Sequence, residues 1–356
     1  MYDLNTLGWN AHFEEAFAPY RERGFAAARV ALEYQGLYRV LTERDEMLAE
    51  VRGKFRYTAQ RREDYPAVGD WIALSRLPNE NRAVIEALLP RTSKFSRKAA
   101  GETSEEQIVA TNIDTVFLVV GLDHNYNLRR IERYLILAFE SGARPVIILS
   151  KADLAKDIEA CLREVEQVAL DTPIHAISAK RGEGIEPLED YLGVGKTIAF
   201  LGSSGVGKST LINRLLGQER QKTQDVREED SRGRHTTVHR ELIVLPSGGL
   251  LIDTPGMREL QLWEAGDGLT DSFADIEELA AQCRFSDCSH EREPDCAVKS
   301  AIAEGKLAAS RLENYRKIQK ELEFLQARTD TRLQQGRKER DKRIHKAMNR
   351  TKPKRS

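Results

Sequence analysis

One loop of the chain has the residue types and spacing that bind the phosphates of a nucleotide. Residues 202–209, GSSGVGKS, match the pattern G-x-x-x-x-G-K-[ST] at every fixed position. An apolar strand is expected before the loop and a helix after it, so the helix N-terminus would add its partial positive charge to the N–H groups of the loop. The residues predicted to bind nucleotide here are Gly202, Ser203, Ser204, Gly205, Val206, Gly207, Lys208, Ser209 and Thr210.

Two residues of this loop have separate predicted roles at the phosphates and Mg²⁺, and a second segment is predicted to bind the same groups. Lys208 should reach the β- and γ-phosphates, and the Ser209 hydroxyl should bind Mg²⁺. Downstream, the sequence DTPG at 253–256 follows an apolar strand. Asp253 can hold the Mg²⁺ shell through water, and the N–H of Gly256 can meet the γ-phosphate. The residues just before it, 241–253, predict an antiparallel hairpin around a Pro-Ser-Gly-Gly turn.

A third segment predicts that the base is guanine rather than adenine. The strand expected at 145–149 ends in SKAD, residues 150–153, which resembles the N/T-K-x-D motif of GTPases. A carboxylate at Asp153 can accept hydrogen bonds from the guanine N1–H and the exocyclic amine, a donor pair that adenine lacks. Lys151 would lie along the ring and fix the phosphate loop. Ser150 stands where Asn is usual, so a purine contact or the bracing of the loop is in question.

The order of the motifs predicts a circularly permuted domain. The sequence SAK, residues Ser178, Ala179 and Lys180, resembles the fifth GTPase motif, whose backbone contacts the guanine oxygen. In ordinary GTPases this motif and the guanine motif follow the phosphate loop, whereas here both precede it. Apolar strands alternate with helical segments, which predicts a parallel sheet with right-handed crossovers and ligands at the carboxyl ends of the strands. These strands are expected at 115–120, 145–149, 174–177 and 197–201.

Three of the four cysteines form a metal-binding pattern with a histidine. The spacing is C-x4-C-x-H-x5-C, and the residues are Cys283, Cys288, His290 and Cys296. Three thiolates and one imidazole complete a tetrahedron around zinc, which predicts a structural site with no open position. The alternative, buried thiols beside a surface histidine, fits poorly because the segment is highly charged. Cys161 lies at helical spacing in another segment and is expected to be a core residue.

The segments before and after these motifs suggest contacts with a polyanion. Five short strands between residues 25 and 90 favour an OB-type barrel, a fold that often binds nucleic acid. Residues 54–62 and 91–98 interleave basic and aromatic side chains, which suits base stacking, although an ordinary solvated rim would look the same. At 312–325, apolar residues line one face of a helix. Residues 331–356 carry eleven Lys and Arg against two acidic residues, so this tail suits RNA binding or serves only solubility.

The length and composition of the chain limit the class of protein that it can be. The chain has 356 residues, which is enough for two or three domains, and its formal net charge is −1. No apolar run approaches the ~18 residues of a membrane span, and the N-terminus has no secretory signal pattern. We therefore expect a monomeric cytoplasmic protein without a membrane partner. The predicted organisation is an N-terminal extension and barrel at 1–100, a permuted GTPase domain at 101–265, a zinc-binding helical domain at 266–330 and a basic tail at 331–356.

Taken together, these motifs resemble the ribosome small-subunit-dependent GTPase family, RsgA (YjeQ-type). The barrel, the permuted motif order, the cysteine spacing and the segment GRHTT at 233–237 carry the resemblance over nearly the whole chain. The resemblance implies slow hydrolysis of GTP to GDP, stimulation by the small ribosomal subunit, rRNA binding and a role in late maturation of that subunit. Ser150 and the long N-terminal extension depart from the family pattern.

The residue that orients the attacking water is not at its usual position. Ras-like enzymes use a Gln directly after the D-x-x-G glycine for this task, but Met257 stands there. His235 in the switch I position could hold the water instead, and the resemblance points to the same residue; the alternative is that His235 only contacts rRNA or solvent. Thr237 is the expected Mg²⁺ ligand, with Thr236 as the alternative. Two other functions stay open: a GTP-dependent RNA-binding switch without significant hydrolysis, and a nucleotide-driven factor that acts on DNA or a metal centre.

Overall fold

The computed structural model of the chain describes residues 2–34, 36–59, 61–78, 80–98, 106–218, 240–253 and 267–324. These residues fall into two compact units. The first takes in the residues up to 97 together with 106–253 and 267–274, and the second takes in residue 98 and 275–324. None of the helices in these ranges has the length and apolar content to cross a bilayer.

Five strands near the N-terminus close into a barrel. They are β1 (Ala26–Tyr34), β2 (Leu37–Thr42), β3 (Glu46–Val51), β4 (Trp71–Arg76) and β5 (Arg82–Leu88). Their order is β1-β2-β3-β5-β4, and the barrel closes because β4 also pairs with β1. In β3, exposed and buried residues alternate strictly, as expected for a strand with one face in a core. The predicted five-stranded barrel is confirmed.

The N-terminal extension covers part of this barrel from outside. It forms a short 3-10 turn, η1 (Leu4–Leu7), and the helix α1 (Ala11–Arg21), which begins at Asn10 because that side chain accepts hydrogen bonds from two N–H groups of the first turn. Phe13 and Phe17 are 2% and 3% exposed; Phe13 and Trp9 pack against Trp71 of β4, and Phe17 packs against Trp9. Burial of each large side chain contributes roughly 2 kcal/mol. The extension is therefore part of the core of the first unit.

The segment after β3 differs from the predicted basic and aromatic rim. It forms α2 (Gly53–Thr58) and the 3-10 turn η2 (Arg62–Asp64). Phe55 packs against the barrel core, whereas Tyr57 is 90% exposed. One aromatic side chain, rather than two, is therefore available on this segment for a stacked base.

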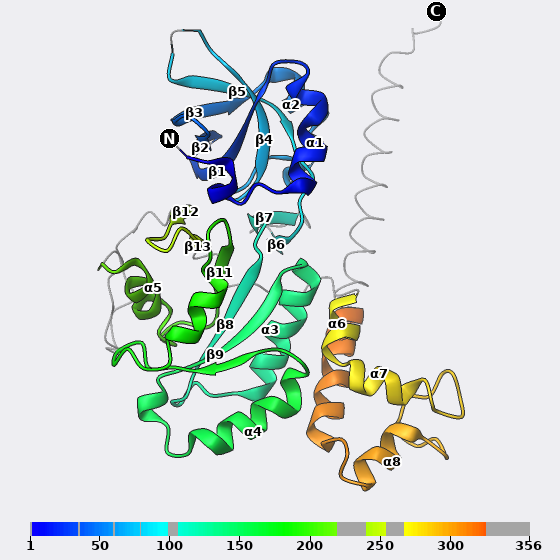
Figure 1. The fold of residues 1–356 in the computed structure, drawn as a ribbon. Helices are drawn as coiled ribbons and strands as arrows, with labels where there is room; N and C mark the ends of the chain where they lie inside the picture. The colour runs from blue at the N-terminus through cyan, green and yellow to red at the C-terminus, as the bar shows by residue number, and fades with distance from the viewer. Residues whose placement is uncertain are drawn as a thin grey trace, which may run out of the picture. The chain divides into compact units, whose positions relative to one another are not determined.

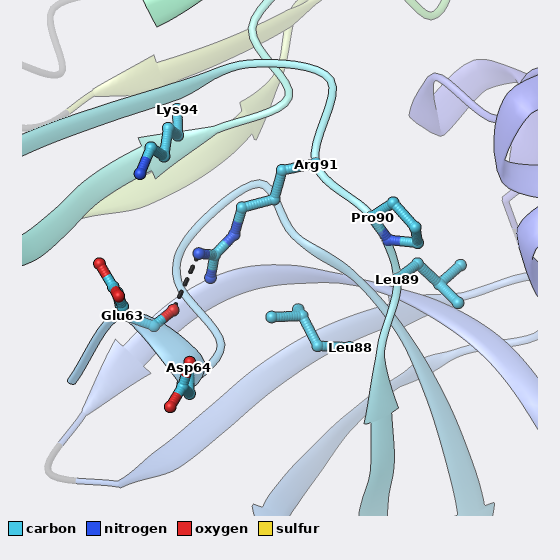
Figure 2. Close-up of a pocket in the computed structure, with 7 residues that line it drawn as sticks. All are labelled: Glu63, Asp64, Leu88, Leu89, Pro90, Arg91 and Lys94. Atoms are coloured by element: carbon cyan, nitrogen blue, oxygen red, sulfur yellow. Dashed lines mark hydrogen bonds between the residues drawn. The ribbon is translucent and has the colours of Figure 1, made fainter. Parts of the chain in front are cut away.

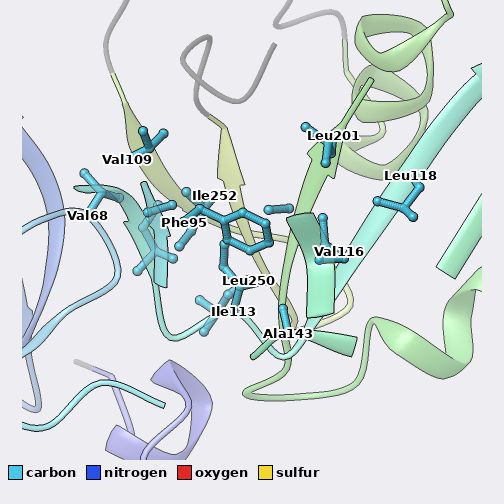
Figure 3. Close-up of a cluster of buried hydrophobic side chains, with 14 of the residues drawn as sticks. Val68, Phe95, Val109, Ile113, Val116, Leu118, Ala143, Leu201, Leu250 and Ile252 are labelled. Atoms are coloured by element: carbon cyan, nitrogen blue, oxygen red, sulfur yellow. The ribbon is translucent and has the colours of Figure 1, made fainter. Parts of the chain in front are cut away.

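The second basic and aromatic segment, 91–98, contributes its aromatic side chain to a core. The strands β6 (Lys94–Lys98) and β7 (Glu106–Thr111) pair as a two-stranded sheet. Phe95 is 2% exposed and lies in a buried cluster with Val109 and Ile252 (Figure 3). Arg91 forms an ion pair with the fully buried Asp70, with Nη2 and Oδ2 2.7 Å apart. Base stacking and a solvated rim, the two interpretations of this segment, are both wrong for Phe95, because its side chain is buried in a core and reaches neither a base nor solvent.

The nucleotide-binding part of the first unit is a doubly wound sheet. Its strands run in the order β10-β9-β8-β11-β13-β12. All neighbours pair in parallel except β12 and β13, which form the predicted antiparallel hairpin. The strands are β8 (Thr115–Gly121), β9 (Arg144–Ser150), β10 (Ile174–Ala176), β11 (Thr197–Leu201), β12 (Glu241–Val244) and β13 (Leu250–Asp253). The predicted permuted α/β sheet is confirmed.

Helices cover both faces of this sheet (Figure 1). On β8, alternate residues face opposite ways, so Leu118 packs with the helices α3 and α4 while Phe117 packs with α5. The helical elements are η3 (Ala152–Leu154), η4 (Glu186–Tyr191), α3 (Leu128–Ser141), α4 (Ile158–Ala169) and α5 (Lys208–Leu216). Cys161 of α4 is half-buried and packs against the core, as predicted.

One strand pairing joins the sheet to the barrel. Leu32 of β1 pairs with Glu241 of β12, and Arg39 Nη2 of β2 lies 2.6 Å from Glu241 Oε1. Arg240, which precedes β12, donates to the carbonyl oxygen of Ile108 in β7. The barrel strands therefore continue the sheet beyond the hairpin that carries Asp253.

Three short helices and one longer helix follow the sheet in the described part of the chain. The helix α6 (Asp267–Ser272) packs on α3 within the first unit. The second unit contains α8 (Ala297–Ala303), a helix over 309–324 and most of α7 (Ala274–Ala280). Tyr315 of the long helix is 5% exposed and donates to Glu277. The predicted apolar face is buried at Leu312, Tyr315, Ile318 and Leu322, while Leu325 and the basic tail lie outside the described residues.

Candidate nucleotide and metal sites

The phosphate loop connects β11 to α5 at the carboxyl end of the central strand. Gly205 and Gly207 have φ of 77° and 96°, the left-handed region that favours glycine. A Cβ at Gly205 would meet no atom within 4 Å, so the loop leaves open space at its tip. The Lys208 ammonium donates to the carbonyl oxygens of Gly202 and Ser203 at 2.7 and 2.5 Å. It therefore closes the loop on itself and is held beside the backbone that would surround a phosphate.

Ser150 ties the guanine motif to the phosphate loop. Its hydroxyl lies 2.5 Å from the carbonyl oxygen of Val206 and 3.2 Å from that of Val120, and the residue is 3% exposed. A serine hydroxyl has one proton, so this proton is used on the backbone and is not available to a purine nitrogen. The sequence left open whether Ser150 braces the loop. The hydrogen bond to Val206 shows that it does.

The other residues of the two guanine motifs lie together. The Ser178 hydroxyl donates to Asp153 Oδ1 at 2.7 Å, and the N–H of Ala152 donates to the carbonyl oxygen of Ile177. This hydroxyl lowers the pKa of Asp153, so its carboxylate is ionised at neutral pH. Ala179 and Lys180 follow Ser178 in a turn.

An aspartate that the sequence analysis missed holds the motif lysine. Lys151 has φ of 59°, and its ammonium lies 2.6 Å from Asp123 Oδ2 in the loop after β8. Burial alone would raise the pKa of Asp123, but Lys151 and the N–H of Asn125 outweigh it and lower that pKa. The available signal was the position of Asp123 just past the end of an apolar strand, where ligand-binding residues gather.

Several predicted site residues lie outside the described residues. Thr237, His235 and Gly256 are among them, together with Thr236 and Met257. Asp253 is described and ends β13, which pairs with β11, the strand that leads into the phosphate loop. Ser209 and Thr210 are half-buried in the first turn of α5.

The four predicted metal ligands come together in the second unit. The ligand atoms of Cys283, Cys288, His290 and Cys296 all lie within 4.8 Å of one another. His290 Nδ1 is 3.6 Å from Cys283 Sγ and 3.4 Å from Cys296 Sγ, and the two sulfurs are 3.9 Å apart. A zinc tetrahedron with ordinary bond lengths has S–S and S–N edges of about 3.8 and 3.6 Å. The donor set and its spacing therefore fit zinc.

A carboxylate organises the loop that carries His290. Glu293 accepts hydrogen bonds from the hydroxyl and the N–H of Ser289 and from the N–H groups of Glu291 and Arg292, at 2.6 to 3.1 Å. The Ser289 hydroxyl is the largest cause that holds the pKa of Glu293 at about 2. His290 has φ of 60°, an unusual value for a residue with a side chain. The hydrogen bonds to Glu293 therefore fix the turn that presents the His290 imidazole.

A cavity of about 460 Å³ lies elsewhere in the first unit (Figure 2). Figure 2 shows Arg91 reaching across it to the backbone of Glu63. Its lining residues are Glu63, Asp64, Leu88, Leu89, Pro90, Arg91 and Lys94. No residue of the phosphate loop or of the guanine motifs lines this cavity, so it is separate from the candidate nucleotide site.

A phosphate loop, two guanine motifs that precede it and a doubly wound parallel sheet define the class: a circularly permuted GTPase. Comparison with known proteins agrees. The family model described as RsgA GTPase matches residues 88–263. A model described as ABC transporter matches residues 186–352, a range that contains the phosphate loop. Phosphate loops occur in many nucleotide-binding families, so this second match does not identify the base.

Individual relatives identify the family more closely. The chain is 46% identical over 352 residues to "Small ribosomal subunit biogenesis GTPase RsgA" of Opitutus terrae, and the match covers 96% of each chain. It is 47% identical to "Small ribosomal subunit biogenesis GTPase RsgA 2" of Lactiplantibacillus plantarum over 85% of each. The structure of YjeQ from Thermotoga maritima matches with a TM-score of 0.64 and 32% identity, over 84% of this chain and 98% of that one. The chain belongs to the RsgA GTPase family.

Proposed function

We propose that the chain binds GTP with Mg²⁺ at the phosphate loop and hydrolyses it to GDP and phosphate. The observation that carries this proposal is the bond from Ser150 to Val206, because it joins the guanine motif to the phosphate loop in one site. In our proposal, Lys208 leaves the carbonyl oxygens of Gly202 and Ser203 and binds the β- and γ-phosphates. Asp153 accepts the two guanine donors, while Lys151, held by Asp123, lies along the ring.

Magnesium would be held by Ser209 and Thr237, with Asp253 acting through water. The ion neutralises charge on the β- and γ-phosphates when it is bound. His235 would orient the attacking water, since Met257 can neither donate nor accept a hydrogen bond usefully. Replacing His235 with Ala should abolish stimulated turnover and leave the Kd for GTP within about twofold. Full turnover in this variant would remove His235 from the mechanism.

We also propose a structural zinc ion at Cys283, Cys288, His290 and Cys296. The donor set leaves no position for a substrate, so the ion would stabilise the second unit rather than react. The sulfur and nitrogen spacing given above supports this assignment. Atomic absorption on the purified chain should give one zinc per chain, and a stoichiometry near zero after purification without chelator would contradict it.

The partner that we propose is the small ribosomal subunit with its rRNA. Relatives at 46% and 47% identity carry the name small ribosomal subunit biogenesis GTPase. The barrel in 1–100, the zinc-binding domain in 266–330 and the basic tail in 331–356 would dock the GTPase domain in 101–265. We propose that the chain acts as a monomer in the cytoplasm during late maturation of the subunit.

GTP turnover with and without small subunits tests this function. At fixed low salt, the purified chain should hydrolyse GTP slowly alone and much faster with added small subunits. Large subunits and the variant Lys208→Ala serve as controls, and excess ATP should not compete with GTP. GTP binding without any stimulated turnover would favour a binding switch over a subunit-dependent GTPase.

A further inference from the structure

The helix α3 contacts the phosphate loop from the side through one arginine. Arg130 lies in the first turn of α3, which begins after its cap Asn127. Its Nη1 is 3.1 Å from Ser203 Oγ and 3.4 Å from the carbonyl oxygen of Asn125. Burial raises the pKa of Tyr134, one turn further along, and the Ser203 side chain partly offsets that rise. Arg130 of this helix therefore holds the second residue of the loop by its hydroxyl.

The charge of Arg130 faces the loop and not a carboxylate. Among the described residues, no Asp or Glu forms an ion pair with Arg130, whereas Lys151 nearby is paired with Asp123. The Arg130 residue is half-buried. A half-buried cation without a carboxylate partner raises the positive potential around the loop, which favours an anion such as a phosphate.

Ser203 is held in two ways that respond differently to nucleotide. Its carbonyl oxygen accepts from Lys208, and its hydroxyl accepts from Arg130. Lys208 must release the carbonyl oxygen when it binds phosphate, so the first contact is lost on binding. The contact with Arg130 uses a different atom of Ser203 and does not depend on Lys208.

We propose that Arg130 is a positioning residue that keeps the first half of the phosphate loop in place when Lys208 turns to the nucleotide. This inference rests on the proposed GTP site. Because the loop would surround phosphates shared by GTP and GDP, Arg130 lowers the Kd of both nucleotides. It does not stabilise the transition state of hydrolysis, so it leaves kcat unchanged.

Nucleotide affinity in variants of Arg130 tests the proposal. Fluorescent GTP and GDP are titrated into the full chain, and single-turnover hydrolysis is measured at saturating GTP. Arg130→Ala should raise the Kd of both nucleotides about tenfold, the effect of one charge-assisted hydrogen bond, with kcat within about twofold. Arg130→Lys should recover part of the affinity. Arg129→Ala is the matched control, since it removes the same charge from the same turn at an exposed position.

A double-mutant cycle separates the contact from a general charge effect. Ser203→Ala removes the hydroxyl that Arg130 contacts, so the two substitutions together should weaken binding no more than Arg130→Ala alone. Additive losses would overturn the proposal, as would a loss of kcat with unchanged GDP affinity. A wild-type chain that binds no GTP would overturn this inference together with the proposed function. Unchanged Kd values in Arg130→Ala, with GTP bound normally by the wild type, would overturn this inference alone.

Discussion

The candidate nucleotide site and the candidate metal site are assembled in opposite ways. The described residues of the nucleotide site come from loops that follow β8, β9, β10 and β11, and strand pairing brings them together. The four metal ligands lie within residues 283–296, between α7 and α8. The first site depends on the folded sheet, whereas the second depends on a short turn and on the ion itself.

This difference predicts which perturbations each site tolerates. A site built by strand pairing exists before its ligand binds, and here Lys208 and Ser150 already hold the loop closed. A site built from one short segment gains much of its order from the metal, because ion binding and folding are coupled there. Perturbing either site should therefore leave the other nearly unchanged.

Loss of one metal ligand should give the largest effect. Cys296→Ser should release the zinc and unfold much of the second unit, since structural zinc contributes roughly 10 kcal/mol or more in small domains. Zinc content and helical circular dichroism measure both changes. GTP affinity should stay within about twofold of wild type. A large loss of GTP affinity would show that the two sites are not independent.

Loss of the guanine carboxylate should give the next largest effect, on the other site. Asp153→Asn removes two charge-assisted hydrogen bonds to guanine, so the Kd for GTP should rise roughly 100-fold. Zinc content should remain at one ion per chain. Asp171→Asn, a change at an exposed carboxylate, is the control. An unchanged ratio of GTP to ATP affinity in Asp153→Asn would exclude Asp153 as the base-selecting residue.

Loss of the Glu293 carboxylate should lower the zinc affinity of the metal site without removing a ligand. Glu293→Ala leaves four N–H and O–H donors of the turn without their acceptor, and changes around metal ligands typically cost roughly 10- to 100-fold in affinity. Competition with a zinc-binding dye measures this loss. Glu291→Ala is the matched control, because Glu291 contacts the Glu293 carboxylate only through its backbone N–H. Equal zinc affinity in the two variants would contradict the role of Glu293.

Loss of the hydrogen bond from Ser150 to the phosphate loop should give the smallest change in affinity. Ser150→Ala removes one hydrogen bond to the loop, so the Kd for GTP should rise about fivefold. Ser150→Thr keeps the hydroxyl and should stay within about twofold. Both values come from the same nucleotide titration. A loss as large as that of Asp153→Asn would mean that the sheet does not preform the loop.

Much of the fold was predictable because its signals are local. Apolar runs such as 115–121 and 197–201 predict buried strands, and the spacing of Cys283 to Cys296 predicts a metal site directly. The burial of Phe95 was not predictable, because its core partners such as Ile252 are far away in sequence and its neighbours are basic. Asp123 and Arg130 were missed for the same reason, since their partners Lys151 and Ser203 lie 28 and 73 positions away.

The permutation has a consequence for how the two ends of the nucleotide-binding sheet are connected to the rest of the chain. The barrel enters the sheet through β7 and the amino end of β8, while the second unit follows the carboxyl end of β13, where Asp253 lies. The barrel also reaches the Asp253 end of the sheet, because Leu32 of β1 pairs with Glu241 of β12, which pairs with Asp253. Changes after Asp253 alter the covalent connection between a nucleotide motif and the metal-binding unit.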